Sequence, residues 1–229
     1  MFFAFNYNYP AYIVFAIFLA YLVVLVVGFS FHEAAHAFVA TKEGDMTPKA
    51  YGRLTLNPAK HIDPLGFVML LVVGFGYAKP VPVNPYNFRR GRLSDFLVSS
   101  AGIFTNLLFA LFFGLLWSVF EVFAPAAIFS NNFFSVFLQV LLQYGMLINI
   151  SLALFNLLPI PPLDGYRMLS AAMGQKGREF RQFMEKYSFV FMIVLAVFVM
   201  FGFNFIGRAA FGIQDGIIWV FEKFFGLFV

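Results

Sequence analysis

The sequence predicts an all-α polytopic membrane protein, with about four to five transmembrane helices and a re-entrant hairpin. The first reason is composition. The chain is 62% hydrophobic and 11% charged, whereas soluble domains are about 45–50% apolar and about 25% charged. The second reason is that several apolar runs reach the length a helix needs to cross a bilayer, about 20 residues. These runs occupy residues 11–40, 96–120, 133–158 and 188–207.

Two further apolar segments are shorter or more polar. Segment 64–78 holds about 13 apolar residues between Pro and Gly, too few to cross comfortably. Segment 209–229 carries three charged residues, and fits either an amphipathic interfacial helix or a poor span. We expect one membrane-embedded unit over residues 1–229, with its core at about 11–170 and C-terminal helices at about 187–229.

The basic residues predict the orientation of the chain. Loops 41–95 and 159–187 hold 13 of the 15 Lys and Arg residues, whereas the first ten residues and loop 121–132 hold none. Positive charge marks the cytoplasmic side of a membrane protein. We therefore expect a multi-pass protein of the cell membrane with its N-terminus outside and both basic loops inside.

The same charges predict the path of segment 64–78. Its two flanks are both basic, so we expect it to enter and leave the membrane on the same side. Gly66, Gly74 and Gly76 lie among Val residues; Gly permits tight turns and Val favours extended strands. We therefore expect a hairpin over 64–83 with a free strand edge, to which an extended peptide could add by main-chain hydrogen bonds.

The sequence HEAAH, residues 32–36, places three ionisable side chains in the first apolar run. On a helix, His32 and His36 lie on one face, one turn apart. Two imidazoles at this spacing bind one Zn²⁺, and Glu33 beside them is positioned to act on a water molecule at the metal. A chance match is disfavoured, because uncompensated ionisable groups inside a membrane cost several kcal/mol, on the order of 3 or more each.

A hydrolytic zinc site needs a third protein ligand. The chain has no cysteine, which excludes a thiolate. His61 lies in a basic loop, where a hydrated side chain is expected, and Asp63 precedes a proline, as a turn or helix cap does. Asp164 follows the third apolar run in NLLPIPPLDGYR, whose prolines break a regular helix; it is either a metal ligand or part of a simple turn. Since the first and third runs both end inside, one metal can be shared between them.

HEAAH (32–36) together with NLLPIPPLDG (156–165) resembles the site-2 protease family of zinc intramembrane metalloproteases, in particular its small members without a PDZ or CBS domain. The resemblance implies zinc ligands at His32, His36 and Asp164, with Glu33 as the general base. It also implies that Asn156 lies near the substrate. One Zn²⁺ per chain is expected.

A third segment, SSAGIFTN (99–106), is similar to the family pattern A-G-P-x-x-N. Its Asn106 is therefore a second candidate substrate-binding residue. Ile103 replaces the proline of the pattern, and Tyr166 stands where a second glycine is common. The first departure puts a local kink in doubt and leaves the ligand set unchanged.

These residues predict a zinc-dependent intramembrane endopeptidase that hydrolyses peptide bonds within or near transmembrane segments of other membrane proteins. The expected partners are such a substrate and the lipid bilayer, with no nucleic acid. The alternative is a non-catalytic membrane metal-binding or transport protein. A transporter needs no base beside the metal and tends to be built from paired repeats, whereas this chain has Glu33 and no visible repeat.

Overall fold

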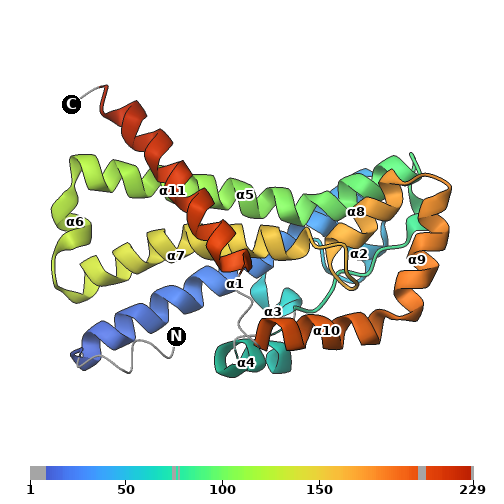
Figure 1. Cartoon of the computed structure of the whole chain (residues 1–229), viewed down its shortest axis with the longest axis horizontal. Helices are drawn as coiled ribbons and strands as arrows, with labels where there is room; N and C mark the ends of the chain where they lie inside the picture. The colour runs from blue at the N-terminus through green and yellow to red at the C-terminus, as the bar shows by residue number, and fades with distance from the viewer. Residues whose placement is uncertain (1–8, 74–75, 77, 201–204, 228–229) are drawn as a thin grey trace.

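Three long helices form the body of the protein in the computed structural model, which describes residues 9–73, 76, 78–200 and 205–227. They are α1 (Ala11–Lys42), α5 (Arg92–Phe123) and α7 (Phe133–Asn156). Within the described residues these three are long and apolar enough to cross a membrane. Figure 1 shows them lying lengthwise beside one another, and each packs against the other two. The predicted runs 11–40, 96–120 and 133–158 are therefore confirmed as helices.

Small residues allow these helices to approach closely. The ring of Phe113 on α5 occupies the space beside Gly145 on α7, where a Cβ would come within 2.7 Å of that ring. Next to it, Met146 and Ile150 are fully buried in the main hydrophobic cluster. Small residues at helix contacts are typical of membrane bundles, where van der Waals packing replaces the hydrophobic effect between helices.

The remaining helices lie at the ends of the bundle or across it. Four short elements connect α1 to α5: α2 (Thr47–Ala50), α3 (Pro58–His61), α4 (Pro64–Val73) and the 3₁₀ helix η2 (Pro85–Asn87). At the opposite end, α6 (Pro125–Phe129) joins α5 to α7 (Figure 1). After α7 come α8 (Asp164–Ala172), α9 (Lys176–Lys186), α10 (Ser188–Met200) and α11 (Phe205–Phe225).

Two helices, α10 and α11, follow the short helices α8 and α9 at the C-terminal end of the chain. The predicted fourth run, 188–207, contains the 13-residue helix α10, but residues 201–204 lie outside the described residues. Helix α11 has 21 residues and crosses α5 and α7 obliquely (Figure 1). It carries Arg208, Asp215, Glu222 and Lys223. A total of four to five transmembrane helices therefore stays a prediction beyond the three helices above.

The structure corrects the prediction of extended strands in segment 64–83. Residues Pro64–Val73 form the ten-residue helix α4, and residues 74, 75 and 77 lie outside the described part of the chain. The ends of the segment do meet, through an antiparallel bridge between Ile62 and Ala78 and a 2.7 Å hydrogen bond from Lys79 N to His61 O. The segment thus returns to its starting point, and its depth in the membrane stays a prediction.

Candidate metal centre

Helix α1 presents His32 and His36 side by side on its inner face. Both residues are buried, at 6% and 8% exposure. Their Nε2 atoms lie 3.2 Å apart, which the four-residue spacing on one helix face allows. Local helix structure therefore places the two imidazoles close enough to share one metal ion.

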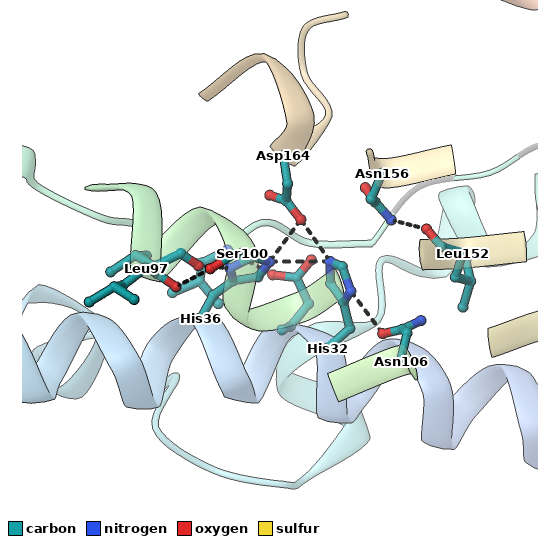
Figure 2. Close-up of polar contacts among 11 residues, drawn as sticks. His32, His36, Leu97, Ser100, Asn106, Leu152, Asn156 and Asp164 are labelled. Atoms are coloured by element: carbon teal, nitrogen blue, oxygen red, sulfur yellow. Dashed lines mark hydrogen bonds and ion pairs between the residues drawn. The ribbon is translucent and has the colours of Figure 1, made fainter. Parts of the chain in front are cut away.

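The third side chain comes from the chain that follows α7. That helix ends at Asn156, a non-helical turn follows, and Asp164 is the first residue of α8. Only a glycine fits after Asp164, because a Cβ on Gly165 would lie 2.2 Å from the carbonyl oxygen of Leu157. The turn brings Asp164 Oδ2 to 3.3 Å from His32 Nε2 and 3.1 Å from His36 Nε2 (Figure 2).

Helix α8 is in turn held against α5 and α9. The guanidinium of Arg181 on α9 pairs with the carboxylate of Asp95 on α5. It also donates a 2.9 Å hydrogen bond to Ser170 Oγ on α8. This polar contact fixes the helix that carries Asp164 relative to the long helix behind the two histidines.

Hydrogen bonds on the far side of each imidazole fix which nitrogen faces Asp164. His36 Nδ1 lies 2.7 Å from the carbonyl oxygen of Val98, and His32 Nδ1 lies 3.0 Å from Asn106 Oδ1 (Figure 2). Because a carbonyl oxygen only accepts, each Nδ1 carries the hydrogen and each Nε2 presents a lone pair. Such outer partners are typical of metal-binding histidines.

Two imidazole lone pairs and one carboxylate oxygen therefore converge, and they fit one zinc ion. The three ligand atoms lie within 4.8 Å of one another. Ligands about 2.0–2.2 Å from a tetrahedral Zn²⁺ lie about 3.4 Å apart, close to the separations seen here. Asp164 Oδ2 is buried and has no hydrogen-bond partner of its own in the described residues. A zinc ion bound between these atoms would satisfy this oxygen and both lone pairs.

Gly102 on α5 closes the site from behind. A Cβ at this position would lie 2.4 Å from His32 Cε1 and 2.5 Å from His36 Nε2, distances that real side chains do not adopt. Neither Gly102 nor Val98 was predicted from the sequence to lie at the site. The spacing could have indicated Gly102, because it lies four residues before Asn106 and thus on the same helix face.

Glu33 directly follows His32 on α1 and is half-buried. Its Oε2 accepts a 3.1 Å hydrogen bond from Val81 N, in the segment that returns from α4. Glu33 is outside the cluster of possible ligands in the described residues. This placement agrees with a role beside the metal and outside its ligand shell, which stays a prediction.

The other candidates from the sequence have defined places. Asn156 donates through Nδ2 to Leu152 O on its own helix, at 3.0 Å (Figure 2). Asn106 is fully buried and its Nδ2 has no partner in the described residues. Their predicted contacts with substrate stay predictions.

The two remaining candidates from the connecting segment take structural positions. His61 is fully buried, and its Nε2 lies 2.7 Å from Thr55 O, so the expectation of a hydrated side chain was wrong. The carboxylate of Asp63 accepts from Gly66 N at 2.9 Å, as predicted for a helix cap. Neither joins the cluster around Asp164 within the described residues.

Comparison with known proteins points to the same cofactor. A family model described as "Peptidase family M50" matches residues 116–199. The protein named "Putative zinc metalloprotease YwhC", from Bacillus subtilis (strain 168), is 45% identical over 184 residues, covering 77% of this chain and 80% of its own. Rip2 of Mycolicibacterium smegmatis is 31% identical over 171 residues, covering 72% of this chain and 62% of its own. No solved structure matches the chain.

A third relative, MJ0611 of Methanocaldococcus jannaschii, is 30% identical over 167 residues, covering 72% of this chain and 76% of its own. All three relatives carry the same zinc metalloprotease description. Together with the cluster of two buried histidines and half-buried Asp164, these matches identify zinc as the cofactor and the chain as a membrane metalloprotease. The chain belongs to peptidase family M50, the site-2 protease family.

Proposed function

We propose that this protein is a zinc-dependent endopeptidase that cleaves other membrane proteins within or near their transmembrane segments. One observation carries the proposal. A three-residue zinc site with a carboxylate beside it lies inside a bundle of helices that are long and apolar enough to span a membrane. Ionisable groups are rare at such positions and mark functional sites.

His32, His36 and Asp164 would hold the metal, which leaves one of four positions for water or substrate. When bound, zinc polarises an amide carbonyl and lowers the pKa of a water molecule to about 7. The two buried histidines would keep this chemistry away from bulk solvent. Hydrogen bonds from His36 Nδ1 to Val98 O and from His32 Nδ1 to Asn106 Oδ1 keep the two imidazoles in the ligating tautomer.

Glu33 would move the protons. Its carboxylate takes a proton from the attacking water and then delivers it to the leaving amine nitrogen, so that the peptide bond breaks without a free proton crossing the site. The half-buried carboxylate has one oxygen held by Val81 N. The other oxygen is then available for the proton transfer.

Asn106 and Asn156 are the proposed substrate contacts. Asn106 accepts from His32 through its oxygen, and its buried Nδ2 has no partner among the residues that the structure describes. An amide nitrogen of this kind is suited to donate to the carbonyl oxygen of a scissile bond, where negative charge develops. Asn156 lies at the end of α7, eight residues before Asp164, and would exchange its bond to Leu152 for one to the peptide.

The proposed orientation places the site toward the cytoplasm. His32 lies ten residues before the end of α1, so it is about 15 Å along the axis from the basic end of that helix. Water would enter from this end. A substrate helix already satisfies its own amides, so it must unwind locally before a carbonyl can reach the site.

Co-expression with doubly tagged single-span membrane proteins tests this function. We expect a new membrane-derived fragment with the wild-type chain and none with Glu33→Gln, which keeps the size of the side chain and removes the base. Equal amounts of fragment with both chains would overturn the proposal. The expression level of each variant in the membrane fraction is the control.

A further inference from the structure

A proline-rich segment, residues 79–84 (KPVPVN), runs beside α1 and is called here the strap. Pro80 and Pro82 have no N–H, so the strap has few hydrogen-bond donors. Lys79 N donates to His61 O at 2.7 Å. Val81 N donates to Glu33 Oε2 at 3.1 Å, and Asn84 N donates to Asp45 Oδ2 at 2.7 Å. Two of these three acceptors are carboxylates of α1 or of the turn that follows it.

The strap is anchored firmly before Val81. The guanidinium of Arg53 donates to Lys60 O, and also to Lys79 O at 3.4 Å. The bridge between Ile62 and Ala78 closes the same region. Fully buried His61 adds its hydrogen bond to Thr55 O.

The strap is anchored equally firmly after Val81. Asp45 is fully buried and also accepts from Asn87 Nδ2 at 2.9 Å. Its burial alone would raise its pKa, but its hydrogen bonds outweigh burial and lower the pKa, so the carboxylate stays charged. Two residues before Asp45, Glu43 pairs with Arg90 and accepts from Ser94 Oγ at 2.6 Å.

Because the strap is anchored on both sides of Val81, the Val81 N–H can hold the Glu33 carboxylate in one position. The Glu33 side chain has three rotatable bonds, and on an isolated helix its carboxylate would sample several positions. A hydrogen bond to a charged oxygen is stronger than one between neutral groups. Pro80 and Pro82 also favour an extended backbone before each proline, which keeps the Val81 N–H aimed at α1.

We propose that the backbone N–H of Val81 is the positioning group of Glu33, and that the strap serves to hold this N–H at a fixed place beside the metal site. The inference rests on the proposed function, in which Glu33 is the base. Val81 acts through Glu33 and contacts neither metal nor substrate in this scheme.

Val81→Pro removes the N–H while it preserves the proline-rich, extended character of the strap. Val83→Pro is the matched control, because Val83 N donates no hydrogen bond within the described residues. We expect Val81→Pro to lower kcat on the order of 10²-fold, the cost of misplacing a catalytic group by about 1 Å. KM and zinc content should stay at the wild-type level, and Val83→Pro should match the wild type in all three.

Amide exchange tests the hydrogen bond without any cleavage. Peptides that cover the strap report on few amides, because Pro80 and Pro82 have none. We expect Glu33→Ala to lose the protection of the Val81 amide. Glu33→Gln should keep it, because its side-chain oxygen still accepts. The Asn84 amide, which is bound to Asp45, should stay protected in both variants and shows that the strap remains folded.

The cleavage assay and the amide-exchange measurement together distinguish a failure of this inference from a failure of the proposed function on which it rests. Full cleavage by Glu33→Gln would overturn the proposed function. Wild-type kcat in Val81→Pro, or an equal loss of kcat in Val83→Pro, would overturn the positioning role. Unchanged Val81 protection in Glu33→Ala would also overturn it, whatever the cleavage assay shows.

Discussion

Gly102 of α5 lies directly against the imidazole of His32 on α1, so closely that a Cβ on Gly102 would come within 2.4 Å of Cε1. The contact joins two spanning helices at the level of the metal. It means that the smallest residue is required at the back of the site, since any side chain there must displace both rings.

Gly102→Ala should therefore weaken zinc binding, by about 10–100-fold if the disturbance equals the loss of an outer-shell partner. Competition with a chelator of known affinity measures this. Gly212→Ala is the control, because a Cβ on Gly212 meets nothing within 4 Å. It should leave zinc affinity unchanged. Equal zinc affinity in Gly102→Ala and the wild type would show that α5 does not press on the ligands.

Asn106→Ala should also weaken zinc binding, because it removes the acceptor that holds His32 Nδ1 at 3.0 Å. We expect a loss of about 10–100-fold in affinity, measured by the same competition. Asn149→Ala is the matched control: Asn149 is equally buried in a spanning helix, but it donates to Gly145 O on its own helix. A similar loss in both variants would indicate general destabilisation, and would remove Asn106 from the outer shell of the site.

Some residues of the site could be predicted from the sequence and others could not. His32, Glu33 and His36 were predictable because helix geometry alone relates them. Their meeting with Asp164 was predictable from topology, since the first and third helices end on the same side. Gly102 and Val98 were not, because their contacts depend on the rotation and height of α5 against α1, which no local pattern encodes.

In the segment that connects α1 to α5, local strand propensity predicted the wrong secondary structure. Val72 and Val73 favour strands when counted alone, but they lie in helix α4. A short apolar run fits a helix and a strand equally well by pattern. His61 was misjudged for a related reason: its basic neighbours suggested solvent, whereas the fold of the loop buries it completely.

Acid should destabilise the end of the helix bundle that carries Glu43. Hydrogen bonds from Arg90 and Ser94 lower the pKa of this carboxyl below its ordinary value of 4.5. The folded state therefore binds fewer protons than the unfolded state, and the stability that Glu43 contributes is present above about pH 4.5 and lost as the pH falls further. Glu43→Gln should show a smaller drop in Tm than the wild type between about pH 6 and pH 3.5, measured in detergent. An equal drop in both would rule out this contribution.

Cysteine labelling tests the proposed orientation, because the chain has no cysteine of its own. Asn131 and Tyr86 are both exposed, Tyr86 at 97%, and they lie at opposite ends of α5. A membrane-impermeant thiol reagent should label Asn131→Cys in intact cells and Tyr86→Cys only after permeabilisation. The reverse pattern would place the basic loops and the metal site toward the outside.

The central claim is that the cluster of His32, His36 and Asp164 binds zinc for peptide hydrolysis with Glu33 as base. The most direct test is cleavage of a tagged single-span protein by purified, reconstituted enzyme whose zinc content has been measured in the same sample. We predict about one zinc per chain in both the wild type and Glu33→Gln. Only the wild type should release a fragment, whose new end maps within or near the transmembrane segment. Release of the same fragment by zinc-loaded Glu33→Gln would contradict the account. So would the failure of the zinc-loaded wild type to cleave any of the tagged single-span proteins tested.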